Sequence, residues 1–325
     1  MRVAVTGGAG FIGSHVVDAL LARGVEVRLV DRHFSPYHGD GEVATAIADL
    51  RDADAVARAL AGCQAVVHLA ASADVNQVVA DPREAEEINT RGTLNVVEAA
   101  HRAGADRVVY ASTIWVYGEQ GEGVVDEDSW LGVPRHFYTA TKLAGESYVR
   151  ALGELYGLEH TILRFGIPYG PRAREAAVLP TFVRRAHEGE PITVAGGGTQ
   201  SRRFVYVEDL ADGVARALAP VAANRIYNLV AEEDVTILQI AELVRELVRP
   251  VDLVDGEGRA ADFRGATVSG ERAARELGWR ARTPFREGSR RYVEWFLATE
   301  EAGAARSRVG PSPPLHGPEP GLATT

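Results

Sequence analysis

Two side chains capable of proton chemistry, Tyr138 and Lys142, stand four positions apart in a segment that we expect to be helical from 138 to 156. This spacing places both on one face of a helix. A nearby ammonium favours the phenolate and lowers the pKa of a phenol, which makes Tyr138 a candidate general acid and base near neutral pH. Lys142 is the only lysine among 35 Lys and Arg residues, and its ammonium could also donate to a ribose hydroxyl.

A second candidate site is the glycine-rich turn from Thr6 to Gly13, between a predicted strand at 2–6 and a predicted helix at 11–23. Such a turn lets the backbone approach a pyrophosphate, and the helix N-terminus offers unpaired N–H groups to it. Asp31 ends the next predicted strand, 25–31, where a carboxylate accepts hydrogen bonds from ribose hydroxyls and repels a 2′-phosphate. These features predict NAD, although Arg32 leaves NADP open. The expected cofactor-binding residues in the turn are Gly7, Gly10, Phe11, Ile12 and Gly13.

Two further strand ends are expected to border the cofactor. Asp49 either meets the adenine amino group or caps a helix that begins near residue 52. The sequence after His68 is rich in small residues, Leu69, Ala70 and Ala71, which leave room for a flat ligand. We interpret His68 itself as a core residue.

The elements that must position these residues alternate between strand and helix. Apolar runs at 65–69, 107–112 and 159–165 read as strands, and 53–60 and 83–103 as helices. This order predicts an α/β fold with a doubly wound parallel Rossmann sheet, in a domain spanning 1–170. A smaller α+β substrate lobe, 171–300, is expected to interleave with it, and residues 301–325 to form a disordered tail. The last predicted helix covers 284–297.

Composition narrows the class of protein. Apolar residues make up 46% and charged residues 25%, with a net charge of −10, so a soluble globular chain is expected and nucleic acid is not an expected partner. No apolar run is long enough for a membrane span. The single cysteine, Cys63, precludes an internal disulfide and a metal-binding cysteine cluster, and no metal is expected. With no secretory leader at the N-terminus, a cytoplasmic setting is expected.

Several motifs together resemble the extended short-chain dehydrogenases/reductases of the nucleotide-sugar epimerase and dehydratase family, over residues 1 to 300. They are TGGAGFIG (6–13), Asp31, Asp49-Leu50, HLAA (68–71), the stretch from Asn89 to Thr93, the AST-x-x-VYG pattern at 111–118, YxxxK (138–142), LRFxxxYGPR (163–172), Gln200 to Asp209, and Glu276 to Trp279.

The resemblance implies roles for particular residues. Thr113 shares the hydrogen bond to the substrate hydroxyl with Tyr138, so Thr113, Tyr138 and Lys142 are the expected catalytic residues. Arg202 and Arg259 match arginines that bind the nucleotide diphosphate, although surface charge is the alternative for each. Further expected cofactor contacts are Leu50, Asn89, Tyr138 and Lys142. A homodimer is implied, with the 83–103 and 138–156 helices at its contact.

The two residues immediately after Thr113 indicate the reaction. Family members that resemble 4,6-dehydratases carry an acidic pair there, and those that resemble decarboxylases carry a glutamate at the second place. Here Ile114 and Trp115 cannot transfer protons, which favours a 4-epimerase working through a 4-keto intermediate. Gly166-Ile167 replaces the usual Phe-Asn, so a net oxidoreductase acting on a nucleotide sugar or small alcohol stays open as the alternative.

Overall fold

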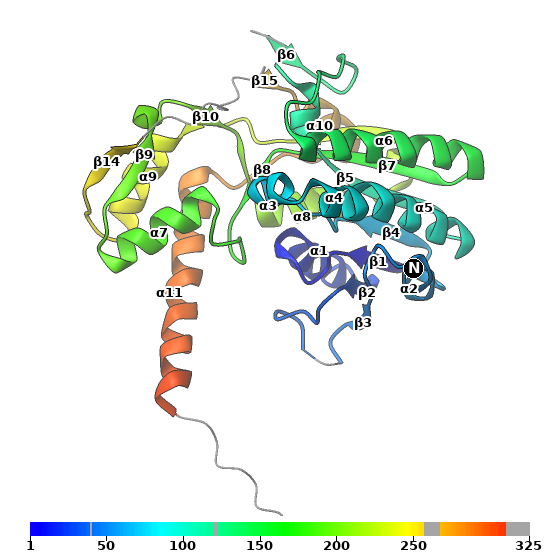
Figure 1. Cartoon of the computed structure of the whole chain (residues 1–325), viewed down its shortest axis with the longest axis horizontal. Coiled ribbons are helices and arrows are strands. Elements are labelled where there is room, and N and C mark those ends of the chain that lie inside the picture. The colour runs from blue at the N-terminus through cyan, green and yellow to red at the C-terminus, as the bar shows by residue number, and fades with distance from the viewer. Residues whose placement is uncertain (40, 120–122, 257–266, 310–325) are drawn as a thin grey trace, which may run out of the picture.

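The computed structural model describes residues 1–39, 41–119, 123–256 and 267–309. Its centre is a sheet of seven strands, all parallel, in the order β12-β7-β5-β4-β1-β2-β3 (Figure 1). The strands are β1 (Arg2–Thr6), β2 (Glu26–Asp31), β3 (Ala44–Ile47), β4 (Ala65–His68), β5 (Arg107–Thr113), β7 (Glu159–Phe165) and β12 (Arg225–Leu229). The predicted doubly wound Rossmann sheet is therefore confirmed.

The central strands are buried on both faces, as parallel strands covered by helices must be. Every residue of β4 and β5 is buried. Helices α1 (Phe11–Leu21) and α8 (Val207–Arg216) contribute to the core on one face, through residues such as Leu20 and Leu210. The other face carries α2 (Ala53–Leu60), α5 (Gly92–Arg102) and α6 (Phe137–Tyr156). Strand order reverses between β1 and β4, the place where such sheets bind ligands.

The segment predicted as one helix from 83 to 103 has a more complex structure. It comprises α4 (Pro82–Glu86), a π-helical turn η1 (Glu87–Arg91) and α5, preceded by α3 (Val75–Ala80), which the sequence did not predict. Asp74 and Asp81 cap α3 and α4 with their side chains, so each short helix begins at its own capping residue. The prediction missed these breaks because the apolar spacing continues across them.

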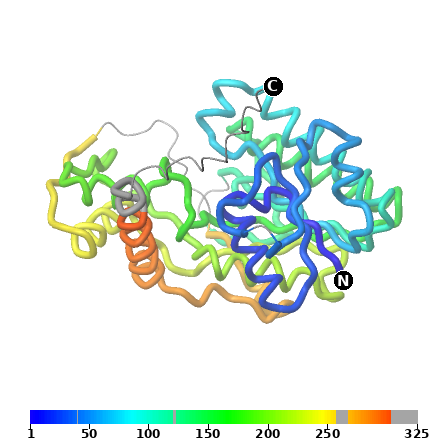
Figure 2. The backbone as a smooth tube through the Cα atoms, turned by 90° about the horizontal axis from the view of Figure 1, so that it is seen from below, coloured from blue at the N-terminus to red at the C-terminus, as the bar shows by residue number. Residues whose placement is uncertain are grey.

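The second half of the chain contributes to both lobes. β12 and α8 join the Rossmann sheet and its covering layer, whereas a separate core lies among α7 (Val178–Glu188), α9 (Ile237–Leu247), β9 (Ile192–Ala195) and α11 (Phe285–Val309). Figure 2 shows the two lobes side by side. α11 is longer than the predicted 284–297 helix and extends into the segment predicted as a disordered tail, because its helix-compatible Ala, Glu and Arg residues continue past Leu297. The remainder of that predicted tail lies outside the described residues.

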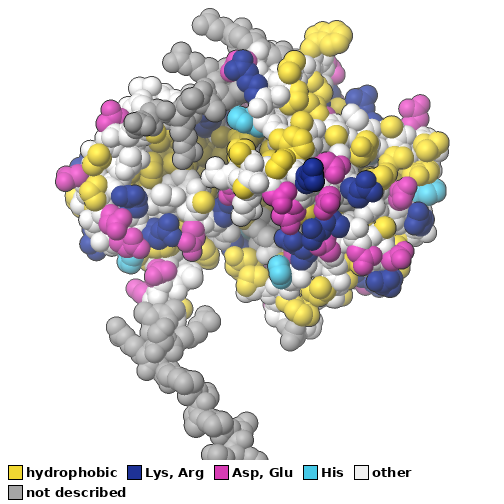
Figure 3. Space-filling model, in the orientation of Figure 1, with side chains coloured by type: hydrophobic (Ala, Val, Ile, Leu, Met, Phe, Trp, Pro, Cys, Tyr) yellow, Lys and Arg dark blue, Asp and Glu magenta, His cyan; other side chains and the backbone are white. Residues whose placement is uncertain are grey.

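Short strand pairs lie outside the central sheet. They are β8 (Ile167–Tyr169) with β11 (Phe204–Tyr206), β9 with β14 (Leu253–Gly256), β10 (Ser201–Arg202) with β13 (Val235–Thr236), and β6 (Val124–Val125) with β15 (Thr267–Val268). α10 (Glu271–Leu277) lies near β12. Acidic and basic side chains are interspersed on the face shown in Figure 3. Among the described residues, no helix combines the length and apolar character that crossing a membrane requires.

Candidate active site

The glycine-rich turn joins β1 to α1 with no spare room. Gly7 has a φ of +73°, and a Cβ there would lie 2.8 Å from the Cα of Ala70. A Cβ on Gly13 would lie 2.0 Å from the carbonyl oxygen of Gly7. The N-cap residue of α1 is Gly10, which has no side chain to cap the helix, so the N–H groups of the first turn stay available to an anion. The turn therefore has the geometry of a pyrophosphate cradle.

Two carboxylates lie at the ends of neighbouring strands beside this turn. Asp31 Oδ2 accepts a hydrogen bond from the Ala9 N–H at 3.1 Å, and its Oδ1 accepts one from the Arg32 N–H at 2.7 Å. Asp49 pairs with Arg51 at 2.7 Å, and this hydrogen-bonded guanidinium lowers the pKa of the Asp49 carboxyl. Both carboxylates line the same cleft as the glycine turn.

We expect Asp31→Ala to weaken NAD binding by about tenfold or more, because a carboxylate that accepts ribose hydroxyl hydrogen bonds contributes roughly 1.5–3 kcal/mol. NADP binding should improve relative to NAD, since the repulsion of a 2′-phosphate is removed and Arg32 remains. Dissociation constants for both cofactors, measured by tryptophan fluorescence, check this. Asp54→Ala, an exposed change on α2, is the control. An unchanged NAD-to-NADP ratio would contradict the role of Asp31.

A cleft of about 860 Å³ runs from the glycine turn to Tyr138. Twelve of the predicted cofactor residues line it, with Thr113 beside the last of them: Gly7, Gly10, Phe11, Ile12, Gly13, Asp31, Asp49, Leu50, Leu69, Ala70, Ala71 and Tyr138. The predictions from the β1 turn and from three strand ends thus meet in one continuous groove.

The catalytic candidates come from β5 and α6, which pack against each other. Thr113 is the last residue of β5, and its Oγ1 accepts a hydrogen bond from the Trp115 N–H at 3.3 Å. Tyr138 lies in the first turn of α6, with the Trp115 ring edge-on at 6.1 Å between centroids. Lys142 follows one turn later, is buried, and donates from Nζ to the carbonyl oxygen of Ala111 at 2.9 Å.

The pKa of Tyr138 differs from the one expected from the sequence, and the pKa of Lys142 is also shifted. Burial raises the pKa of the Tyr138 phenol to about 12, and Arg174 opposes that rise. Burial also lowers the pKa of Lys142 to about 8, against the raising effect of Glu146. The predicted lowering of the Tyr138 pKa is therefore wrong, because the net shift is upward. Burial has the largest effect on the pKa of Tyr138. The Lys142 ammonium donates to the Ala111 carbonyl oxygen and lies 5.9 Å from the centroid of the Tyr138 ring.

Asn89 does not line the cleft. Its buried side chain accepts a hydrogen bond from the Ser72 N–H at 2.7 Å and donates to the Ser72 carbonyl and to Thr141 Oγ1. It thereby fixes the loop after Ala71, which borders the cleft, from the π-helical turn η1. His68 is buried between Thr6 and Thr93, as expected of a core residue, and burial lowers its pKa to about 3.

Of the two predicted diphosphate arginines, the structure describes only Arg202. Arg202 lies on β10, where its Nη1 donates to the carbonyl of Ser201, and it does not line the cleft. Arg259 lies outside the described residues. The segment after β8 does line the cleft, and its Arg174 pairs with Asp74 at 3.1 Å. Sequence reasoning missed Arg174, although it stands two residues past the quoted YGPR motif.

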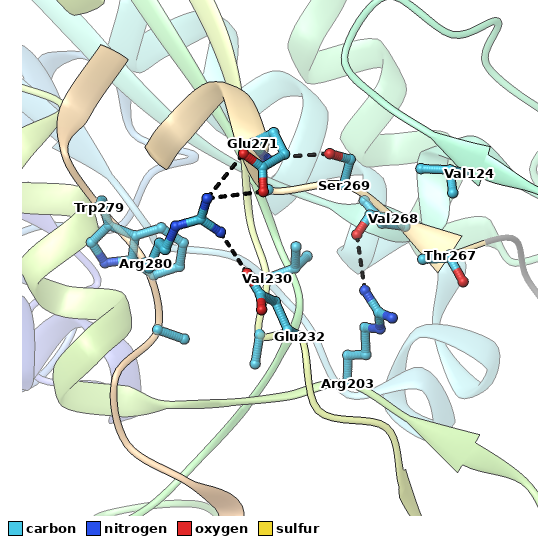
Figure 4. Close-up of a pocket in the computed structure, with 13 residues that line it drawn as sticks. Val124, Arg203, Val230, Glu232, Thr267, Val268, Ser269, Glu271, Trp279 and Arg280 are labelled. Atoms are coloured by element: carbon cyan, nitrogen blue, oxygen red, sulfur yellow. Dashed lines mark hydrogen bonds and ion pairs between the residues drawn. The ribbon is translucent and has the colours of Figure 1, made fainter. Parts of the chain in front are cut away.

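A smaller pocket of about 260 Å³ shares no lining residue with the cleft (Figure 4). Arg280 in it pairs with Glu232 and Glu271, and Arg203 donates to the Val268 carbonyl and pairs with Asp234. Its cationic groups are thus already partnered, and it has neither the tyrosine nor the glycine turn. We therefore place the chemistry in the larger cleft.

The fold and the site define a class: a dinucleotide-binding Rossmann enzyme with a tyrosine–lysine pair beside the cofactor cleft. Comparison with known proteins refines it. The NAD dependent epimerase/dehydratase family model matches residues 3–229, and the chain belongs to this family. Its cofactor is NAD, and it is an NAD-dependent enzyme of nucleotide sugars.

Three relatives illustrate the range of chemistry in the family. UDP-glucuronic acid decarboxylase 1 of Danio rerio is 32% identical over 91% of this chain and 72% of its own length. The dTDP-glucose 4,6-dehydratase of Streptomyces niveus is 32% identical over 91% of this chain and 93% of its own. The UDP-glucose 4-epimerase of Thermus thermophilus, solved in complex with NAD, has a TM-score of 0.84 and 36% identity, covering 91% of this chain and 99% of that one.

Proposed function

We propose that this protein is a 4-epimerase of a nucleotide sugar that works through a 4-keto intermediate. The observation that carries the proposal is the identity of the side chain next to the candidate base: the indole of Trp115 packs edge-on against Tyr138, where a dehydratase or decarboxylase needs a carboxylic acid. With Ile114 beside it, this part of the site offers no second proton-transfer group.

The carboxylates elsewhere in the cleft support the same conclusion. Asp74 caps α3 and pairs with Arg174, and Glu175 pairs with Arg184. Asp31, Asp49 and Glu84 lie with the cofactor-binding residues, and Arg51 pairs with both Asp49 and Glu84. The carboxylates that line the cleft are thus already engaged as hydrogen-bond acceptors or ion-pair partners.

NAD held in the cleft would supply a hydride acceptor and donor for a carbinol carbon. The protein's own residues handle the proton: Tyr138 takes it from the sugar hydroxyl and later gives it back, while Thr113 shares the hydrogen bond to that hydroxyl. Lys142 supplies a positive charge one helical turn away that would stabilise the Tyr138 phenolate against the opposing effect of burial. Inversion at C4 would follow if the 4-keto sugar presented its other face to the returning hydride before Tyr138 gave the proton back, with the cofactor unchanged overall.

A net oxidoreductase is the second candidate, favoured by one observation. Ile167 lines the cleft at the position where the family usually has a diphosphate-contacting asparagine. An apolar side chain cannot donate to a phosphate, so the substrate of this candidate would be held differently from the substrates of family members that have the asparagine. Such an enzyme would consume NAD in proportion to substrate.

Proton NMR of a panel of UDP- and dTDP-hexoses with substoichiometric NAD tests the proposal. For one panel member we expect a second anomeric signal to grow to a constant ratio while total NADH stays below the enzyme concentration. NADH that accumulates with product would establish the oxidoreductase. Loss of CO₂ or formation of a 6-deoxy-4-keto sugar would contradict the epimerase.

We also propose that the protein is a cytoplasmic homodimer that associates through α5 and α6. These helices pack side by side, and α6 exposes Leu155 and Tyr148. The buried, unpaired Cys63 supports a reducing compartment. Light scattering coupled to size exclusion should give twice the chain mass of 34.9 kDa, and Leu155→Glu should shift the species toward monomer.

A further inference from the structure

Helix α6 holds two consecutive residues of β5 with two side chains one turn apart. Lys142 Nζ donates to the Ala111 carbonyl oxygen at 2.9 Å, and Glu146 Oε1 accepts a hydrogen bond from Ser112 Oγ at 2.5 Å. The next residue of β5 is Thr113. This pair of contacts therefore sets the position of the threonine relative to the helix that carries Tyr138.

Glu146 is itself held in a defined position. Arg164 on β7 donates to it twice, from Nε to Oε1 at 3.0 Å and from Nη2 to Oε2 at 2.8 Å. Their side chains are 2% and 4% exposed. Arg164 also donates from Nη1 to the Tyr117 hydroxyl at 2.9 Å. Donors from β5 and β7 therefore hold the Glu146 carboxylate in one position.

The other ionisable groups around Lys142 carry no charge near neutral pH. Tyr110 on β5 lies with its ring centroid 5.0 Å from Nζ, and burial raises the pKa of its phenol well above the usual value. Tyr138 on α6 has its pKa raised to about 12 by burial. His68 on β4 has its pKa lowered to about 3 by burial. Among the described residues, the carboxylate whose charge raises the pKa of Lys142 is thus Glu146, which follows it by one turn of α6.

We propose that Glu146 is a positioning residue for the catalytic pair, serving as the counter-ion that keeps Lys142 protonated in its buried site and as the anchor for the end of β5. The inference rests on the proposed role of Tyr138 and Lys142. The buried Glu146–Arg164 ion pair takes no direct part in the proposed hydride and proton steps, and this inference gives it a role.

The sign of the effect depends on burial. Desolvation lowers the pKa of Lys142 to about 8, close to working pH, and the Glu146 carboxylate raises it. Removing that carboxylate leaves desolvation unopposed, so Lys142 loses its proton at lower pH. The ammonium that favours the Tyr138 phenolate would then be lost within the neutral range.

Lys142 is the only lysine in the chain, so protein labelled with [ε-¹³C]lysine gives a single lysine signal whose titration can be followed directly. We expect the midpoint for Glu146→Gln to fall by about one pH unit or more relative to the parent protein, the size of shift that a close opposite charge produces. Glu146→Asp should recover part of that fall. Glu154→Gln removes a charge from an exposed position on the same helix and should leave the midpoint unchanged.

An unmoved midpoint in a folded Glu146→Gln protein would overturn the proposal. Where that variant fails to fold because Arg164 is left unpaired, the double variant Glu146→Gln/Arg164→Met takes its place. The same direction is expected, because it is the charge of Glu146 that raises the pKa of Lys142. The titration uses no substrate, so an unmoved midpoint would not contradict the epimerase proposal. Likewise, a nucleotide-sugar panel that shows no reaction would not affect the titration test.

Discussion

Tyr138→Phe is expected to lower turnover about 10²- to 10⁴-fold, the contribution of a positioned general acid and base. Phenylalanine keeps the ring that packs against Trp115 and removes only the hydroxyl. NAD affinity should change little, because the glycine turn and Asp31 are untouched. Steady-state rates and NAD dissociation constants on the same preparation separate the two effects.

The matched control is Tyr148→Phe, which removes a phenolic hydroxyl from a partly exposed position on the same helix. It should retain full turnover. If Tyr138→Phe kept turnover within about threefold of the parent, proton transfer could not be assigned to Tyr138, since general acid–base catalysis contributes far more than that.

Gly13→Ala should weaken NAD binding about 100-fold, equivalent to losing two charge-assisted hydrogen bonds of roughly 1.5 kcal/mol each. The alanine methyl would lie 2.0 Å from the Gly7 carbonyl oxygen, a separation that no Cβ tolerates, so the turn must shift. Overpacking of this kind also costs about 1–3 kcal/mol in unfolding free energy. Isothermal titration with NAD and thermal unfolding measure the two losses.

Gly39→Ala is the control for the glycine change, because a Cβ there meets no atom closer than 3.7 Å. It should leave both NAD affinity and unfolding unchanged. Wild-type affinity for NAD in Gly13→Ala would mean that the turn does not hold the pyrophosphate as its geometry indicates.

The sheet could be predicted because its signals are local. Continuous apolar runs at β4 and β5, each followed by small or polar residues, are typical of strands buried on both faces. The glycine turn could be predicted because the positive φ of Gly7 and the close backbone approach at Gly13 exclude side chains in any protein. The breaks between α3, α4 and η1 depended instead on capping by Asp74 and Asp81, which competes with a continuing helical pattern.

The sequence allowed us to predict most of the residues that line the cleft. It was less informative about residues that act by positioning other residues. Asn89 has a place in a family motif, but its hydrogen bonds to the Ser72 backbone depend on a long-range approach of two loops. The pKa of Tyr138 depends on burial, which spacing along a helix does not reveal. Glu146 follows Lys142 at the same helical spacing as Lys142 follows Tyr138, so the sequence places all three on one face of the helix. The pairing of Glu146 with Arg164 on β7 could not be predicted in this way.

In the proposed reaction, a hydride leaves C4 of a nucleotide sugar and returns to the same carbon in the same site. The most direct measurement uses nucleotide hexoses deuterated at C4, incubated with enzyme and catalytic NAD and followed by ²H NMR. We expect deuterium to stay at C4 of the product, now in the inverted configuration, with no deuterium entering free NADH. Deuterium at C6, in a pentose product or in released NADH would contradict the 4-epimerase.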